Sequence, residues 1–397
     1  MRIYVAESIF QRGQAGDGKG DMKILHLVGQ REDIGGILSV IRCLHQVGPV
    51  DRYQHSVWVH KGYEETREPI LDYRRGSFII SDSFSHFLIL FTSVLSFLGV
   101  RRLLNTESFD VIHAHTRGGL IVALIVSWLM RRPVLFTNHT FAKRTGFYRW
   151  ISKQKRMTTV LLNPTMALHY NIPIKNPRSW IVFSGCADHF LDQQIAENSW
   201  SSTGPQSKLK LVGMGSVVRW KGWHLPIQAI AKLPEEMRSR VEFHLWGPEQ
   251  RDIDAQAFSN ELKDFINKNN LHDSVFLHGP TNKVVESLQS GHFVVVASEN
   301  EPCSVSLMES LALGLPALAA RSGGNVDIVH DGDTGVLFEN GSVEDLKNKI
   351  VSILNGEIRL SSAVEIRESV RGWAASVMTE KYNCIYDQMA KLNSSQS

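Results

Sequence analysis

The chain has 397 residues, of which 43% are hydrophobic, with four cysteines and a formal net charge of +3. Its length favours two domains of similar size, and its small net charge argues against a strongly basic nucleic-acid-binding protein, so no nucleic-acid partner is expected. The cysteines are widely spaced and form no C-x-x-C pair, which argues against a disulfide framework and indicates a reducing, cytoplasmic location.

The N-terminal segment, residues 1–21, has no continuous apolar core and ends in a stretch rich in Gly and Asp. It therefore does not resemble a signal peptide, and we expect a disordered extension before a fold that starts near Met22.

Short β-branched runs alternate with helical patterns through residues 22–195. Strands are expected at 23–29, 55–60, 77–81, 110–116 and 133–140, with a last one near residue 180. This alternation predicts an α/β domain built on a parallel sheet.

Two apolar windows lie in this half, at Phe87–Val100 and Leu120–Met130. Each is shorter than the roughly 20 residues that a membrane-spanning helix needs. Each is also followed by a pair of arginines, which suits the last turn of a helix. We interpret both as buried helices rather than membrane insertions.

Residues 196–208 are polar and rich in Ser, with a Gly–Pro pair, which is typical of a linker. The strand–helix alternation then restarts and continues over 209–372, which predicts a second doubly wound domain. Two such domains facing each other form a cleft, with ligands expected at the carboxyl ends of the strands. The last segment, 373–397, has a helical pattern, and composition leaves open whether it covers its own domain or returns to the first.

In each half, a glycine-containing turn follows the first strand. Gly35 and Gly36 would let backbone N–H groups approach a phosphate or a sugar, although a plain turn explains them equally well. Arg219 and Lys221, beside Gly222, suit a pyrophosphate, and this interpretation is favoured over an exposed charged loop because the turn lies at the expected crevice.

His113, His115 and His139 all fall at the ends of predicted strands. A single such histidine is usually structural, but three at one sheet edge favour at least one that faces a ligand. A zinc site is disfavoured because no cysteine or carboxylate partner accompanies them.

Two glutamates eight positions apart mark the stretch "ENEPCSVSLME". Pro302 disfavours helix at Glu301, so Glu301 is expected in a loop and Glu309 inside the helix that follows. Ser304 can cap that helix and leave backbone N–H groups free for phosphate or sugar oxygens. Because the surrounding positions are apolar, we favour a polyhydroxylated ligand over two solvated surface glutamates.

The run from Glu301 to Phe338 resembles the E-x7-E signature region of retaining, nucleotide-sugar-dependent glycosyltransferases of the GT-B fold (glycosyltransferase family 4, group 1 type). "FDVIHAHT", "LFTNHT", "GS-x4-KG" and "VFLHG" occur in the order typical of that family, as does the aromatic C-terminal helix. The resemblance implies the GT-B fold, two Rossmann-like domains facing across a cleft, with residues 373–397 packing back on the N-terminal, acceptor-side domain and the donor bound by the C-terminal one.

The resemblance also implies roles for individual residues. His139, Glu301 and Lys221 would be catalytic, with His139 near the reacting face of the donor sugar, Glu301 against its hydroxyls and Lys221 on the diphosphate. The remaining donor-binding positions would be Gly35, Gly36, Arg219, Ser304, Val305, Ser306 and Glu309, of which Glu309 would hold the ribose. Cations and helix N–H groups that stabilise the leaving diphosphate would make a metal unnecessary, so neither metal nor cofactor is expected.

Three positions depart from the family pattern. Ser216 stands where an arginine is usual, so that Arg219 would have to serve instead. "SGCA" (184–187) replaces "NGVD", and Cys303-Ser304 replaces a Phe-Gly pair. Phosphate binding is therefore expected to differ in detail from the family pattern.

The implied function is transfer of a sugar to an acceptor hydroxyl with retention of configuration, in cell-surface polysaccharide or lipopolysaccharide synthesis. The acceptor would be a saccharide or a lipid-linked saccharide. Residues 141–157 combine six cations with four aromatics, which suits peripheral contact with an anionic membrane, such as the cytoplasmic face of the inner membrane, as well as it suits a solvated basic helix. A GT-B-fold nucleotide-sugar epimerase and a catalytically silent sugar-nucleotide-binding partner are the alternatives.

Overall fold

The computed structural model describes residues 21–29, 36–49, 52–65, 71–81, 85–174, 177–195, 200, 208–250 and 252–394. The predicted N-terminal extension lies outside these residues except for Asp21, and so do Gly35 and nearly all of the predicted linker.

The first domain contains a parallel sheet in the order β3-β2-β1-β4-β5-β6-β7. Its strands are β1 (Met22–Leu27), β2 (Tyr53–His60), β3 (Asp72–Gly76), β4 (Val111–Ala114), β5 (Val134–Asn138), β6 (Met157–Leu161) and β7 (Ser179–Ile181). The order reverses between β1 and β4, and in doubly wound sheets such a reversal opens a crevice at the carboxyl ends of the strands.

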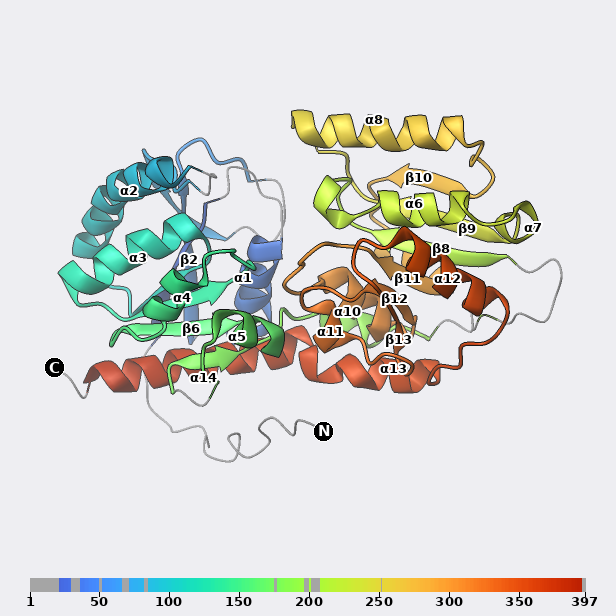
Figure 1. The fold of residues 1–397 in the computed structure, drawn as a ribbon. Helices are drawn as coiled ribbons and strands as arrows, with labels where there is room; N and C mark the ends of the chain where they lie inside the picture. Colours follow the sequence, from blue (N-terminus) through green and yellow to red (C-terminus); the bar gives the residue numbers. More distant parts are fainter. Residues whose placement is uncertain are drawn as a thin grey trace.

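Helices cover both faces of this sheet (Figure 1). They are α1 (Gly36–Val47), α2 (His86–Thr106), α3 (Arg117–Met130), α4 (Thr145–Ile151) and α5 (Pro164–Tyr170). Side chains alternate across each strand, so Leu25 and Leu27 pack on the α2–α3 side, while Ile24 packs on the opposite side.

The second domain contains a parallel sheet in the order β10-β9-β8-β11-β12-β13. Its strands are β8 (Leu209–Met214), β9 (Val241–Trp246), β10 (Val275–Gly279), β11 (Phe293–Val296), β12 (Ala317–Ala320) and β13 (Gly335–Phe338). Its helices are α6 (His224–Ala231), α7 (Glu235–Arg238), α8 (Ile253–Lys268), α9 (Val284–Gln289), α10 (Val305–Ala312), α11 (Asn325–Ile328), α12 (Val343–Leu354) and α13 (Ala363–Val370). The order again reverses beside the first strand, here between β8 and β11.

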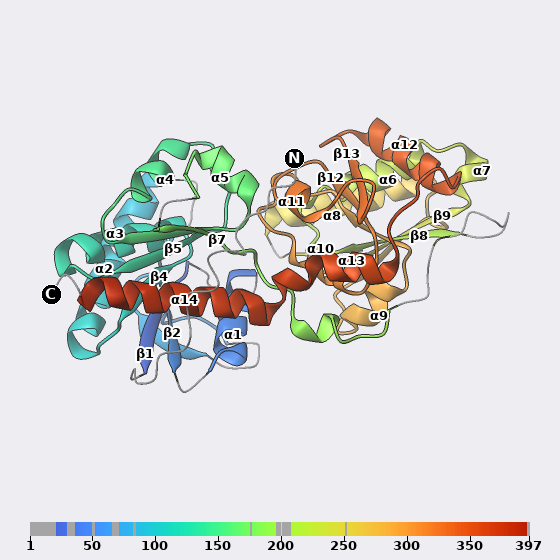
Figure 2. The ribbon, with the colours of Figure 1, turned by 90° about the horizontal axis from the view of Figure 1, so that it is seen from below.

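The C-terminal helix α14 (Ala375–Ser394) returns to the first domain (Figures 1 and 2). It packs against α1 and β4, and its Asp387 accepts hydrogen bonds from Arg52 at 2.6 Å and from Tyr53 at 3.0 Å. The expected architecture of two doubly wound domains with a returning C-terminal helix is confirmed, whereas the domain boundaries stay predictions.

The third strand differs from the expectation. We expected it at 77–81, but the chain pairs with β2 through Asp72–Gly76, where Ser56 and Asp72 are in register. Because β3 is an edge strand, its charged side chains can reach water, and Ile80 instead packs in the core beyond the strand. Strand β6 was not anticipated at all, since it lies at the end of the basic segment.

Helix α2 is longer than its apolar window suggested. It spans 21 residues and is long and apolar enough to cross a membrane by length and composition, although no other helix among the described residues meets that test. One third of its most apolar stretch is buried in the protein, and its closest partner is α3.

Candidate active site

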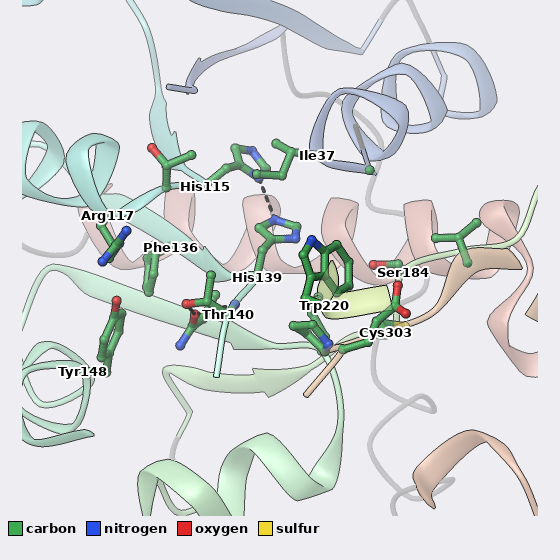
Figure 3. Close-up of a pocket in the computed structure, with 17 residues that line it drawn as sticks. Ile37, His115, Arg117, Phe136, His139, Thr140, Tyr148, Ser184, Trp220 and Cys303 are labelled. Carbon is green, nitrogen blue, oxygen red and sulfur yellow. Dashed lines mark hydrogen bonds between the residues drawn. The ribbon is translucent and has the colours of Figure 1, made fainter. Parts of the chain in front are cut away.

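A pocket of about 270 Å³ lies between the two domains (Figure 3). The first domain contributes residues that follow β4 and β5, among them His115, Arg117 and His139, together with Gly36 and Ile37 at the start of α1. The second domain contributes Trp220, Glu301, Pro302, Cys303 and Val305. The pocket therefore lies where the carboxyl ends of both sheets meet, as expected for two doubly wound domains.

Glu301 lies at the second-domain wall of the pocket with only 8% of its surface exposed. Its Oε1 accepts a hydrogen bond from the Lys221 ammonium at 2.6 Å, and both side chains are largely buried. Its Oε2 is buried and has no hydrogen-bond partner among the described residues. A buried carboxylate oxygen without a donor is costly, so this atom is suited to accept a hydrogen bond from a ligand hydroxyl.

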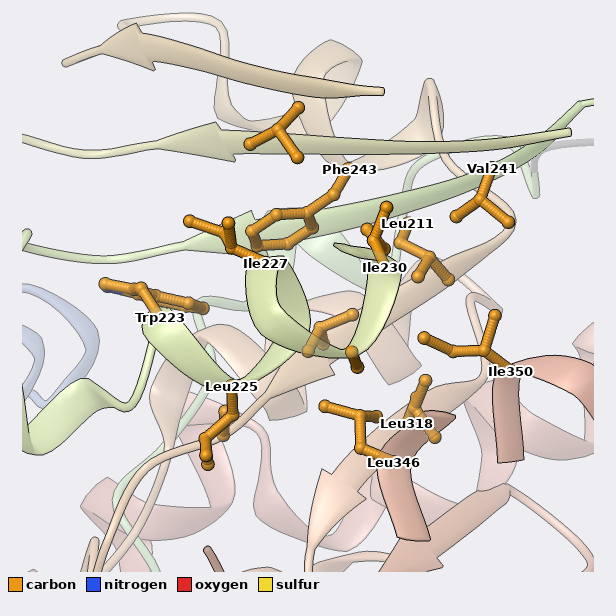
Figure 4. Packing of buried hydrophobic residues seen from close by; sticks show 14 of the residues in the cluster. Leu211, Trp223, Leu225, Ile227, Ile230, Val241, Phe243, Leu318, Leu346 and Ile350 are labelled. Carbon is orange, nitrogen blue, oxygen red and sulfur yellow. The ribbon is translucent and has the colours of Figure 1, made fainter. Parts of the chain in front are cut away.

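The loop that carries Lys221 is anchored in the core of the second domain (Figure 4). Trp223 is almost fully buried there, and its Nε1–H donates to the backbone oxygen of Ser216 at 2.9 Å. Gly222 has φ +70°, and a Cβ at this position would run into the carbonyl of Ala297. The Lys221 ammonium consequently has little freedom, and it also lies 4.6 Å from the centre of the Trp220 ring.

Helix α10 begins beside Glu301 and points its N-terminus toward the site. Ser304 occupies the N-cap position as expected, but its side chain makes no capping bond, and its Oγ lies 3.4 Å from Oγ of Ser306. The first N–H groups of a helix have no partner within the helix. The N–H groups at Val305 and Ser306 thus remain suited to an anion, and Val305 lines the pocket.

Five of the predicted site residues are not among those that line this pocket: Arg219, Lys221, Ser304, Ser306 and Glu309. Lys221 reaches the pocket wall only through its ion pair with Glu301. The Arg219 guanidinium binds both carboxylate oxygens of Glu261, at 2.7 and 2.8 Å, and lies over the ring of Phe258. Glu309 lies in the middle of α10, where burial raises the pKa of its carboxyl to about 7. No hydrogen bond or ion pair to this carboxylate occurs among the described residues.

The three histidines noted in the sequence have different positions. His139 lines the pocket, and its Nε2 makes a hydrogen bond with Nδ1 of His115 at 3.2 Å, in which the tautomers decide the donor. His113 is fully buried behind them, bonded to Thr137 and Tyr386 at 2.8 Å each. His26, which the sequence did not single out, lies beside His115 and His113, and ring nitrogens of these three lie within 4.8 Å of one another.

The two domains also touch directly beside the pocket. The Asn163 amide donates to the carbonyl oxygen of Pro302, and its Oδ1 caps α5 by accepting from Met166 at 2.7 Å. Close by, the backbone N–H of Thr165 donates to Asp327 at 3.0 Å. The position of the Glu301 segment relative to the first domain is therefore held by hydrogen bonds.

Several pocket residues were missed in the sequence. Trp220 stands between Arg219 and Lys221, and only these two charged neighbours were considered as ligand contacts. Arg117, Asn138 and Ser184 also line the pocket. The sequence contained a signal for each of them. Arg117 directly follows a predicted strand, Asn138 lies in "LFTNHT" and Ser184 in "SGCA". Doubly wound sheets place ligand contacts at and just after the ends of their strands.

Two family models match the chain. "Glycosyltransferase Family 4" matches residues 34–165, and "Glycosyl transferases group 1" matches residues 194–372. Together they account for both domains on either side of the pocket.

Several relatives with similar sequences are glycosyltransferases. The sulfoquinovosyl transferase of Arabidopsis thaliana is 26% identical over 299 residues, which cover 69% of this chain and 54% of that protein. A D-inositol 3-phosphate glycosyltransferase of Arthrobacter sp. is 24% identical over 314 residues, which cover 70% of this chain and 72% of that protein. The match thus spans only about half the length of the first of these relatives.

Solved structures share the fold. Sucrose-phosphate synthase from Thermosynechococcus elongatus superimposes with a TM-score of 0.77 at 16% identity, over 93% of this chain and 99% of that one. HepE from Anabaena, solved with UDP and glucose, has a TM-score of 0.67 at 17% identity, over 92% of this chain and 100% of that one. At such identities the likeness concerns the fold alone, and it confirms the expected GT-B architecture.

Proposed function

The chain belongs to the group 1, family 4 type of glycosyltransferases, and from this premise we propose that it transfers a sugar from a nucleotide-diphosphate donor to an acceptor hydroxyl. The observation that carries the proposal is the buried Lys221–Glu301 ion pair at the domain junction, in which Glu301 Oε2 has no donor in the part of the chain that the structure describes. A sugar hydroxyl would supply that donor, and the remaining N–H groups of Lys221 would bind a phosphate oxygen.

The proposed mechanism rests on stabilisation of the leaving group. Lys221 and the N–H groups at the start of α10 would hold the negative charge that develops on the diphosphate as the bond to the sugar breaks. Arg219 could take part only by leaving Glu261, so we assign it a lesser role than the sequence suggested. With positive charge already supplied by the chain, transfer is expected to persist in the presence of EDTA.

Retention of configuration is part of the proposal. A covalent double displacement needs a free carboxylate as nucleophile on the face of the sugar opposite the nucleotide; retaining glycosidases add a second, acid/base carboxylate roughly 5 Å away. Glu301 is the one carboxylate among the described pocket residues, and it is already paired with Lys221. Front-face substitution through an oxocarbenium-like state fits this arrangement, with His139 beside the sugar.

The experiment is a panel of nucleotide sugars, beginning with UDP-sugars because HepE was solved with UDP and glucose. A transferase should release the nucleotide slowly by hydrolysis and faster once an acceptor is present. Interconversion of sugars would instead indicate the epimerase, and binding without turnover the silent partner.

The matched variants are Lys221→Ala and Lys232→Ala. Lys232 lies in the same domain, and 57% of its side chain is exposed, far more than that of Lys221. We expect the first variant to lose most of the turnover and the second to keep it, so near-normal transfer by Lys221→Ala would refute the assignment.

We further propose that the acceptor is lipid-linked and that the first domain meets an anionic membrane surface. Of the four aromatics in residues 141–157, Tyr148 is buried, whereas Phe147 and Trp150 are exposed. The Trp128 ring lies edge-on to Trp150 with centroids 5.8 Å apart, and its neighbour Leu129 is 69% exposed. Exposed aromatics beside cations are suited to an interfacial position.

The cations around this patch are exposed as well. They are Arg131, Lys143, Arg144, Lys153, Lys155 and Arg156. Sedimentation with liposomes tests the proposal: binding should need anionic lipid, weaken with salt and fall in Trp128→Ala/Trp150→Ala. Equal sedimentation with neutral lipid, or none at all, would favour an acceptor free in solution.

A further inference from the structure

A row of four histidines runs from the pocket into the interior of the first domain. His139 Nε2 meets His115 Nδ1 at 3.2 Å, His115 Nε2 meets His26 Nδ1 at 2.9 Å, and His26 Nε2 meets His55 Nδ1 at 2.9 Å. The four residues come from neighbouring strands or the loops after them, in the order β5, β4, β1 and β2. This row is the histidine relay.

The strand pattern explains why the rings meet. His26 lies two positions after Ile24, and His55 two positions after Tyr53, and these four side chains all point to the α1–α14 side. His115 and His139 continue the same alternation from Val111 and Leu135. The relay thus crosses one face of the sheet diagonally, because His26 is in register with His113 and His55 with Ile24, toward the amino end of β2.

The two ends of the relay differ. At the pocket end, no partner for His139 Nδ1 occurs among the described residues, and the ring lines the pocket. At the inner end, His55 Nε2 is buried and has no hydrogen-bond partner among the described residues. The nearest titratable rings there are Tyr386, with its centroid 6.1 Å from that of His55, and His45 of α1, edge-on to His55 at 6.5 Å. His45 Nδ1 is likewise buried without a hydrogen-bond partner among the described residues.

Neutral rings in such a row have only two arrangements of protons. Each neutral imidazole carries one N–H, and each of the three contacts needs one donor and one acceptor. Either every ring has its proton on Nδ1, or every ring has it on Nε2. The atom that His139 presents to the pocket is therefore coupled to the atom that His55 leaves in the interior.

The burial of the inner end decides between the two arrangements. With all protons on Nε2, an N–H of His55 would be buried without an acceptor, and orphaned buried N–H groups are rarer in proteins than under-satisfied acceptors. With all protons on Nδ1, the inner atom is a bare nitrogen, and the N–H at the other end meets solvent or ligand.

We propose that His55, His26 and His115 are positioning residues that hold His139 in its Nδ1–H tautomer, so that His139 offers a hydrogen-bond donor to an oxygen of the sugar. The role of the donor rests on the proposed function, whereas the tautomer does not. Burial lowers the pKa of His55 to about 3 and that of His139 to about 4, and also lowers the pKa of His26 and His115, which keeps the relay neutral.

A metal ion is the competing use of these rings. Nitrogens of His26, His113 and His115 lie within 4.8 Å of one another, close enough to share a zinc ion. Every one of those nitrogens already has a hydrogen-bond partner: His113 is bonded to Thr137 and Tyr386, and the other two lie within the relay. The cluster is thus satisfied without a metal.

The direct test is nitrogen NMR of the full chain labelled with ¹⁵N-histidine, without substrate. The two tautomers and the cation have different imidazole nitrogen shifts, so each ring can be assigned. We expect the Nδ1–H form for all four relay histidines near neutral pH. A relay ring in the Nε2–H form or charged, or stoichiometric Zn²⁺ binding that shifts the signals of His26, His113 and His115 together, would overturn the inference.

Two variants separate positioning from folding. His115→Phe removes the partner of His139 and should turn that ring to a mixture of tautomers, with a several-fold loss of kcat that exceeds any change in donor KM. His113→Phe is the matched control, because His113 is equally buried at the position paired with His26 but lies outside the relay. It should leave the His139 signals unchanged, so an equal change in both variants would also contradict the inference.

The proposed function and this inference can fail separately. If the tautomers are as expected but no nucleotide sugar is turned over, the relay stands and the glycosyltransfer proposal falls. If transfer occurs but His139 has the Nε2–H form, the glycosyltransfer proposal stands and the inference about the relay falls.

Discussion

Replacement of Glu309 by Gln should stabilise the protein, and increasingly so as the pH rises. The carboxyl has no partner to offset its burial among the described residues, and burial raises its pKa from 4.5 to about 7. In the unfolded chain the same group titrates near the ordinary value. Between these two values the unfolded chain releases a proton that the native protein still holds, so stability falls as the pH rises through that window.

The size of the effect follows from the shift in pKa. A difference of about 2.5 pKa units between folded and unfolded chain corresponds to about 3 kcal/mol, because each unit is worth about 1.4 kcal/mol. This cost is absent at about pH 4.5 and complete above about pH 7. Gln has the same shape and no charge, and Glu309 is only partly buried by surface area, so the variant should be more stable than the wild type by up to that amount at about pH 8.

Urea denaturation of both proteins at several pH values measures the difference in free energy of unfolding. The transition of the second domain is the relevant one, since a two-domain protein need not unfold in one step. Glu286→Gln is the control, because Glu286 is exposed on α9 and makes no side-chain hydrogen bond or ion pair among the described residues. A difference for Glu309→Gln that does not change with pH, or a less stable variant at about pH 8, would refute the reasoning.

Three further changes test other parts of the site and fold. Lys221→Met leaves the Glu301 carboxylate buried without its cation and should lower the free energy of unfolding in urea by about 3 kcal/mol. The double variant Lys221→Met/Glu301→Gln should recover most of this loss, and a double variant as unstable as the single one would contradict the pairing. Asn163→Asp keeps the oxygen that caps α5 but loses the N–H that reaches the second domain, so steady-state kinetics should show a higher donor KM, and an unchanged KM would argue against a role in closure. Asp387→Asn weakens the ion pair with Arg52, whose side chain is about one third exposed, so the pair contributes less than about 1 kcal/mol. Hydrogen exchange in α14 should therefore accelerate only a few-fold. Unchanged exchange would mean that this pair does not hold the helix.

The architecture was predictable because both sheets are parallel and buried on both faces. Strands of that kind appear as apolar runs, and polar residues or glycines follow them where the carboxyl ends form the site. His139 and Glu301 were recognised on that basis, and both line the pocket. The edge strand β3 was missed for the opposite reason, because "DYRRG" has no apolar run and its pairing with β2 is decided by tertiary contact.

Contacts between distant residues could not be predicted from one sequence. Arg219 suited a phosphate by its position, yet Glu261, which is 42 residues away, takes the guanidinium in a bidentate pair. The histidine relay joins residues up to 89 positions apart, and no local pattern indicates that His26 and His55 are partners of the pocket histidines. Local rules place a side chain on a face of a strand, whereas the packing of the strands decides what it meets.

Residues 184–187 ("SGCA"), which depart from the family pattern, form part of the connection between the two domains. They lie next to the returning segment before α14. The backbone of Cys186 exchanges hydrogen bonds with that segment: its carbonyl oxygen accepts from the N–H of Ala375 at 2.7 Å, and its N–H donates to the carbonyl of Trp373 at 3.0 Å. The Phe183 ring stacks on Trp373.

Both connections between the domains thus run side by side as one joint, and Asp188 strengthens it by accepting from the N–H of Ser376 at 3.1 Å. Closure of the domains over a donor would turn about this joint, while the Asn163 contact opens and closes on the pocket side. The substitutions at 184–187 therefore concern the hinge as much as the phosphate. Ser184 alone of the four lines the pocket, and Cys186 is fully buried within the joint.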